Sequence, residues 1–215
     1  MHKLAKVVLE GYREWTESLG DDREWLIQRT QSEIEKTASE AAKEVGAFYL
    51  PTRKDVLIFI LNGIENPELI FESLERVSPV PIRVEIGCGK TPLEALRGKP
   101  CKETGPIAAL HVDINSFRSK DYYLGYVESI QLFESLLKVG LGFGAVGGYL
   151  GGDNVLLFAD PSDAQSLGST ICTMFDVKVG IGIASTARES LALAARALRR
   201  LRENRERRLE VIEGR

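Results

Sequence analysis

Two acidic residues lie where a folded chain could hold a divalent cation. Asp113 ends the apolar run Ile107 to Val112, which is typical of a buried strand. Asp153 lies in Gly151-Gly152-Asp153-Asn154, a sequence typical of a tight hairpin turn. Carboxylates on rigid strand ends suit Mg²⁺ or Mn²⁺, which keep water ligands and take further ligands from substrate phosphates. We therefore predict a metal site on Asp113 and Asp153, with the carbonyl of Ile114 as a further ligand.

The residues around this acidic pair are suited to a nucleotide. Gly151 and Gly152 allow positive φ and leave room for a ligand to approach the backbone. The stretch Asn115-Ser116-Phe117 precedes a helical pattern, and the free N–H groups of a helix start favour phosphate. Cationic candidates for phosphate binding are Arg118, Lys120 and Lys178. A Gly-Gly-Asp-Asn turn by itself is also a common structural hairpin, so the combination with Asp113 carries the prediction.

Three polar residues close to the pair are further candidates. His111, near the same strand end, is a candidate catalytic residue, and the alternative is a sheet histidine with a satisfied hydrogen bond. Asn115 and Asn154 are candidates for hydrogen bonds to ribose or base. Each could equally cap an Asx turn.

The first half of the chain shows the same order of patterns as the second half. The apolar run Leu4 to Leu9 ends at Glu10, as Ile107 to Val112 ends at Asp113. A helical pattern, two strands joined by a tight turn, a second helix and a last strand follow in both halves. The closing strands and their following threonine N-caps are Val84 to Gly89 with Thr91, and Val179 to Ala184 with Thr186.

This order predicts an α+β protein made of two tandem ferredoxin-like domains with antiparallel sheets. Gly98-Lys99-Pro100 limits the last helix of the first half to little more than one turn, whereas Ala192 to Leu209 can extend a long helix. We place the boundary in Gly98 to Gly105, which gives domains 1–99 and 106–215. We expect the two sheets to pack together about a pseudo-twofold axis.

The first half does not repeat the acidic hairpin in the same form. Alignment of Val56 to Phe59 with Val155 to Phe158 places Lys54 where Asp153 stands. We therefore expect no equivalent metal site there. Arg53 is expected to clamp the substrate phosphates from across the domain interface, or to be an exposed turn residue without a role.

Other residues of the first half leave two alternatives open. Glu10 and Asp55 are candidate ligands of a second metal site. Tyr12 and Trp15 could stack on a guanine base, although an aromatic pair beside a strand end more often packs on the core.

Composition and charge exclude several classes of protein. The 215 residues carry a formal net charge of −3, which favours neither nucleic acid nor a membrane surface as partner. No stretch approaches the roughly 20 apolar residues of a membrane span, and we expect a cytoplasmic protein. Three widely spaced cysteines fit no disulfide framework, so we expect reduced, structural thiols: Cys88, Cys101 and Cys172. The arginine-rich tail from Arg199 to Arg215 is expected to be a solvated helix end, with phosphate or RNA contact as the alternative.

These motifs together resemble a known enzyme family. HVDINSF (His111 to Phe117) and GGDN (Gly151 to Asn154) resemble the class of GGDEF diguanylate cyclases and adenylyl cyclases. The match to archaeal GTP cyclohydrolase III is closer and covers nearly the whole chain. Its further segments are similar to Glu10-Gly11-Tyr12-Arg13-Glu14-Trp15, Arg53-Lys54-Asp55, Asn62-Gly63 and Gly180 to Ile183.

The resemblance implies an enzyme that binds GTP on two Mg²⁺ or Mn²⁺ ions held by Asp113 and Asp153. The implied reaction opens the imidazole ring, keeps the formyl group on the product and releases two phosphates, within riboflavin or deazaflavin biosynthesis. A homo-oligomer is expected. Glu10 stands where some relatives carry Asp, and the segment Leu96 to Pro106 is short, so contacts built there can differ. The alternatives are a nucleotidyl cyclase, which Val155 in place of the GGDEF phenylalanine disfavours, and a non-catalytic GTP-sensing module, which the acidic pair disfavours.

Overall fold

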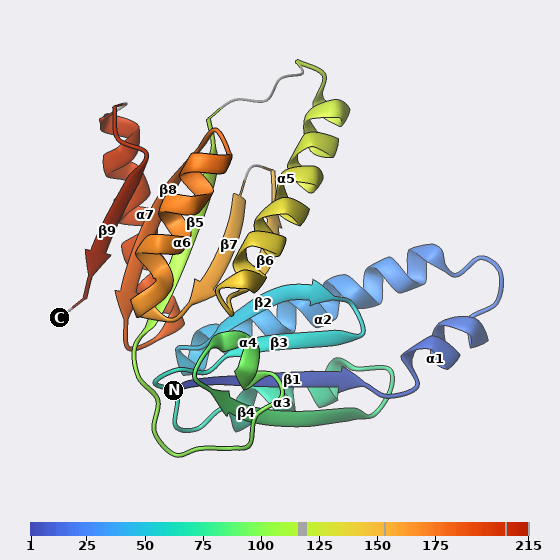
Figure 1. The fold of residues 1–215 in the computed structure, drawn as a ribbon. Helices are drawn as coiled ribbons and strands as arrows, with labels where there is room; N and C mark the ends of the chain where they lie inside the picture. Colours follow the sequence, from blue (N-terminus) through green and yellow to red (C-terminus); the bar gives the residue numbers. More distant parts are fainter. Residues whose placement is uncertain (116–119, 153, 205, 215) are drawn as a thin grey trace.

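The computed structural model describes residues 1–115, 120–152, 154–204 and 206–214. Two β-sheets follow one another along the chain, each accompanied by helices, and the segment between Gly89 and Ile107 links them (Figure 1). The predicted α+β class with two repeated units is confirmed. The predicted residues Ser116, Phe117, Arg118 and Asp153 lie outside the described part of the chain.

The first sheet is antiparallel and has the strand order β2-β3-β1-β4. Its strands are β1 (His2–Leu9), β2 (Phe48–Arg53), β3 (Val56–Ile60) and β4 (Ile82–Gly89). The accompanying helices are α1 (Tyr12–Ser18), α2 (Glu24–Val45), α3 (Glu68–Val77) and α4 (Pro92–Ala95). Helix α2 buries Ile34, Ala38 and Ala41 at helical spacing against this sheet, and it ends at Gly46 with φ 82°. The short α4 agrees with the predicted helix of little more than one turn.

The second sheet has the strand order β6-β7-β5-β8-β9. Its strands are β5 (Ile107–Ile114), β6 (Val146–Gly151), β7 (Asn154–Ala159), β8 (Val177–Ala184) and β9 (Leu209–Glu213). The accompanying helices are α5 (Tyr122–Gly142), α6 (Pro161–Met174) and α7 (Ala187–Glu203). The predicted threonine caps form at both repeats, because Thr91 and Thr186 accept hydrogen bonds from the backbone N–H of Glu94 and Glu189.

The C-terminal tail corrects one prediction. Helix α7 ends at Glu203, and β9 then adds a fifth strand, parallel to β8. Leu209 and Val211 pack on the helix-side core of the second sheet. The tail is therefore not a solvated helix end, and the second sheet is not purely antiparallel. The many arginine and glutamate residues just before β9 favoured a helix prediction, so the short strand pattern of Leu209–Glu213 was not recognised.

A third apolar cluster joins the two halves. Leu4, Leu50 and Ile60 of the first sheet pack with Ala109 and Phe158 of the second. Equivalent edge strands meet there, since a Cβ at Gly148 of β6 would lie 2.7 Å from the side chain of Leu50 on β2. Contact between equivalent elements is what the predicted pseudo-twofold relation requires. None of the helices in the described ranges is long and apolar enough to cross a membrane.

The cysteines correct a second prediction. Cys88 and Cys101 form a disulfide with a Cα–Cα distance of 5.9 Å, and Cys172 is a half-buried free thiol. The backbone N–H of Cys88 donates to the carbonyl of Lys99, so the chain after α4 returns to lie beside β4. The spacing of the cysteines could not show this return, because it depends on tertiary packing.

We predict one titratable thiol per chain in denaturant without reductant, and three after reduction. A thiol-reactive chromophore measures this number directly. A cross-link over a separation of 13 residues also raises stability by about 3 kcal/mol, so reduction should lower the melting temperature. Three thiols before reduction would contradict the disulfide, and Cys172→Ala, which should leave no thiol, is the control.

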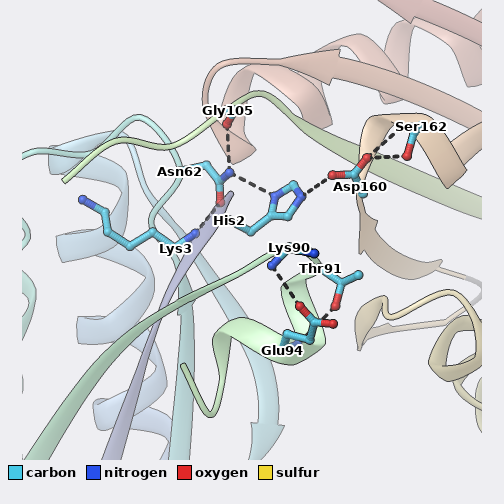
Figure 2. A network of polar contacts seen from close by, with 9 residues as sticks. All are labelled: His2, Lys3, Asn62, Lys90, Thr91, Glu94, Gly105, Asp160 and Ser162. Carbon is cyan, nitrogen blue, oxygen red and sulfur yellow. Dashed lines mark hydrogen bonds and ion pairs between the residues drawn. The ribbon is translucent and has the colours of Figure 1, made fainter. Parts of the chain in front are cut away.

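A buried polar network fixes the two domains to each other (Figure 2). His2, 1% exposed at the start of β1, contacts Asp160 through Nε2 at 2.9 Å. Asn62 donates to His2 Nδ1 at 3.1 Å and to the carbonyl of Gly105 in the linker at 3.0 Å. Asp160 also caps α6 by accepting from Ser162. With a neutral imidazole, Nε2–H donates to Asp160 and Nδ1 accepts from Asn62, so every partner is satisfied.

The network makes stability depend on pH in a defined direction. Burial lowers the pKa of His2 below 6.5, although Asp160 opposes this by favouring the charged form. Burial raises the pKa of Asp160, but its hydrogen bonds from Ser162 and His2 outweigh this and the net direction is down. Asp160 therefore stays ionised at pH 5, while the unfolded chain takes up a proton on His2 as the pH falls through about 6.5.

We predict that the free energy of unfolding falls as the pH drops from about 7 to 5, and that His2→Gln flattens this dependence. Urea titrations at several pH values measure it. The only other histidine is His111, so His111→Gln is the comparison variant for the loss of a histidine outside the network. An unchanged slope in His2→Gln would contradict the assignment.

Candidate active site

The carboxylate of Asp113 lies near the end of the central strand of the second sheet. On strand β5 its neighbours are Asn154 of β7 on one side and Lys178 of β8 on the other. Asp113 is 8% exposed. A carboxylate with so little contact with water needs a cation beside it.

Arg202, from the last turn of α7, supplies that cation. Its Nε lies 3.1 Å from Asp113 Oδ2 and its Nη2 lies 2.9 Å from Oδ1, which is a bidentate pair. The guanidinium therefore contacts both oxygens of the predicted metal ligand. Sequence reasoning had missed Arg202, which it treated as part of a solvated tail.

Two glycines on β8 bring α7 close enough for this pair to form. A Cβ at Gly180 would lie 2.3 Å from the carbonyl oxygen of Ala194, and one at Gly182 would lie 2.0 Å from that of Ser190. Only glycine permits such an approach of helix backbone to strand. The Gly-x-Gly pattern seen in the sequence thus serves helix packing, and through it the position of Arg202.

A cleft of about 670 Å³ opens beside Asp113. It is lined by Asp113, Ile114, Asn115, Asp176, Lys178, Arg202 and Arg208. Oxygen ligands for a hard cation and three cations for an anion thus line one hollow. The cleft thus brings together four residues that the sequence predicted for the site: Asp113, Ile114, Asn115 and Lys178.

Two of the three cationic side chains of the cleft donate to backbone carbonyls. Lys178 Nζ donates to the carbonyl of Leu201 at 2.7 Å. Arg208 donates to the carbonyls of Phe175 and Val177 and lies 3.7 Å from Asp176 in an ion pair. Asp176 and Arg208 are further residues that sequence reasoning missed, because neither belongs to a recognisable motif.

His111 and Asn154 contact each other rather than the cleft. His111 Nε2 lies 2.9 Å from Asn154 Oδ1 on the neighbouring strand. This agrees with the alternative of a sheet histidine with a satisfied hydrogen bond. The same bond orients the amide of Asn154, the residue that follows the acidic hairpin turn, and a catalytic role for His111 stays a prediction.

Among the described hairpin residues, the predicted positive φ values are confirmed. Gly151 has φ 97° and Gly152 has φ 61°, and Tyr149 donates its hydroxyl to the carbonyl of Gly152. Asp153 lies outside the described residues, so its approach to Asp113 stays a prediction. Within the described ranges no group of three or more His, Cys, Asp or Glu side chains could hold a metal ion.

The sheet register shows how the hairpins of the two halves correspond. The pairs that close the two turns are Arg53–Val56 and Gly151–Asn154. The residue before Val56 is Asp55, and the residue before Asn154 is Asp153. The alignment that placed Lys54 at the position of Asp153 is therefore wrong by one residue, and Asp55 corresponds to it.

The first copy nevertheless lacks the strand carboxylate. Glu10 N–H donates to the carbonyl of Pro81, just before β4, as Asn115 N–H donates to that of Asp176, just before β8. Glu10 therefore corresponds to Asn115. Two residues earlier on each strand, Val8 stands where the second copy has Asp113.

The second metal site on Glu10 and Asp55 stays a prediction. Glu10 Oε1 pairs with Arg83 Nε at 2.8 Å, and Asp55 Oδ2 pairs with Arg53 Nη2 at 2.6 Å. Each carboxylate thus has its own arginine.

Four other predicted residues line separate hollows. Arg53 and Gly151 line an interdomain groove of about 790 Å³, and Lys120 and Gly152 line a pocket of about 300 Å³. The described cleft at Asp113 contains none of them. The phosphate clamp by Arg53 therefore stays a prediction. Tyr12 packs on the core of the first sheet, 5.3 Å from the ring of Trp15, as the packing alternative requires.

The fold and this cleft define a class: tandem ferredoxin-like domains, with a strand-end carboxylate and a cluster of cationic side chains in the second domain. The sequence pattern of GTP cyclohydrolase III matches residues 4–105 and 98–213. The chain belongs to the GTP cyclohydrolase III family.

Individual relatives are similar in sequence to this chain over nearly their full length. A protein of Aeropyrum pernix named GTP cyclohydrolase III is 35% identical over 93% of this chain and 92% of its own. One of Sulfurisphaera tokodaii with the same name is 32% identical over 99% of both chains. Among solved structures, a bacterial light-regulated adenylyl cyclase covers 98% of this chain and 85% of its own, at 9% identity and a TM-score of 0.41.

Proposed function

We propose that the chain hydrolyses GTP to 2-amino-5-formylamino-6-(5-phosphoribosylamino)pyrimidin-4-one and two phosphates. One water adds at C8 and the C8–N9 bond breaks, so the formyl group stays on N7. Two further waters release the β- and γ-phosphates one at a time. Family membership supplies the reaction, and the observation that carries its location is the buried Asp113 in a cleft with three cations.

The donor atoms at Asp113 fit a hard divalent cation. The guanidinium of Arg202 already places positive charge beside both carboxylate oxygens, which supports a cation at this position. Asp113, the carbonyl of Ile114 and Asp153 would hold Mg²⁺ or Mn²⁺. When bound, the metal would neutralise phosphate charge and make water a better nucleophile near neutral pH.

The protein's own groups would bind and orient the substrate. Lys178 and Arg208, held by backbone carbonyls, present fixed positive charge to a triphosphate in the cleft. Asn115 lines the same cleft, and its amide donates to Asp176 at 2.7 Å. From this position it would contact the ribose or the base. The homo-oligomer, the cytoplasmic location and the place in riboflavin or deazaflavin biosynthesis stay predictions.

The assay that tests the proposal combines ultraviolet absorbance with phosphate analysis during incubation with GTP and Mg²⁺. Ring opening predicts loss of the purine spectrum and two inorganic phosphates per GTP. Pyrophosphate with an intact purine spectrum would support a nucleotidyl cyclase instead. Binding of GTP without turnover would support a sensing module.

We predict that Asp153→Asn lowers kcat at least about 100-fold, since it removes a ligand charge worth several kcal/mol at the transition state. The melting temperature should change little, because the side-chain volume is nearly constant. Asp22→Asn, an exposed acidic position between α1 and α2, is the control and should keep full activity. Near-normal turnover in Asp153→Asn would contradict the site.

A further inference from the structure

We propose that Arg202 is an internal counter-ion that leaves Asp113 when a divalent cation binds and then binds the triphosphate. The inference rests on the proposed function, because it assumes that Asp113 is a metal ligand. It makes Arg202 a residue that couples the binding of metal to the binding of nucleotide.

The geometry makes the guanidinium and a metal ion competitors. Arg202 contacts both oxygens of Asp113, so a metal on either oxygen would share that oxygen with the guanidinium. Two cations on one carboxylate would also repel each other strongly in a partly buried site. This repulsion favours movement of the guanidinium away from Asp113 when a metal binds.

The two partners differ in their freedom to move. Asp113 lies on the central strand, paired on both sides, and its side chain is 12% exposed. The side chain of Arg202 is 60% exposed and extends from the last turn of α7, so it can swing without burying a charge. The arginine is thus the partner that can leave.

A triphosphate is the natural new partner for the displaced group. The other two cations of the cleft, Lys178 and Arg208, are tied to backbone carbonyls, whereas Arg202 is tied to the carboxylate that the metal would take. A planar guanidinium binds phosphate oxygens in the same bidentate manner as carboxylate oxygens. Metal at Asp113 would turn the guanidinium of Arg202 toward the cleft, where a triphosphate would offer it phosphate oxygens. Each ligand should therefore strengthen the binding of the other.

The test measures binding without turnover. Titration calorimetry with Mn²⁺ alone, followed by a non-hydrolysable GTP analogue at saturating Mg²⁺, compares wild type with Arg202→Gln. The variant should bind Mn²⁺ about tenfold more tightly and the analogue about tenfold more weakly, within the usual range of coupling between sites. Arg199→Gln, at an exposed arginine on the same helix, is the control and should change neither. Arg202→Lys keeps the charge and should restore the weaker Mn²⁺ binding.

The melting temperature, measured with and without Mn²⁺, is a second readout that shows whether Arg202→Gln simply folds poorly. Without metal, Arg202→Gln leaves Asp113 without its arginine and should lower the melting temperature, and saturating Mn²⁺ should raise it more than in wild type. Equal or weaker Mn²⁺ binding in Arg202→Gln would overturn the proposal while leaving the metal site intact. Absence of divalent-ion binding in wild type, with and without the analogue, would overturn the proposed function itself.

Discussion

A carboxylate that is almost excluded from water must be matched by positive charge, and this constraint organises the second domain. Asp113 lies on the central strand, so its position is fixed from both sides by hydrogen-bonded neighbours. Two glycines on β8 let α7 approach closely enough for Arg202 to reach both carboxylate oxygens. The same carboxylate that binds a guanidinium also suits a divalent cation with a nucleotide.

The two domains share a framework but not this chemistry. The first copy has Val8 at the position of Asp113, and its last helix, α4, spans only Pro92–Ala95. The second copy continues into α7 and β9, and this extension carries Arg202 and Arg208 into the cleft. The first domain contributes its apolar surface and the His2 network, which hold the second domain from one side. The first domain therefore supports the second, and the second carries the charged side chains of the cleft.

The sequence predicted the framework well because its signals are local. Apolar runs, glycine turns and threonine caps depend on neighbours along the chain, and they located the repeated units, both hairpins and the central strand with Asp113. The arginine that pairs with Asp113, the β9 edge and the Cys88–Cys101 disulfide were missed because each joins segments distant in sequence. The hairpin alignment was wrong by one residue because four apolar residues match equally well in two registers, whereas hydrogen-bonded pairs permit only one.

The central claim is that Asp113 binds a divalent cation when a guanine nucleotide occupies the cleft. The most direct measurement is a crystal structure of the protein with Mn²⁺ and a non-hydrolysable GTP analogue, with the metal located by anomalous scattering. We expect an anomalous peak about 2.1 Å from a carboxylate oxygen of Asp113, with the triphosphate beside it. An analogue bound elsewhere, with Asp113 still paired to Arg202 and no manganese between them, would contradict the claim.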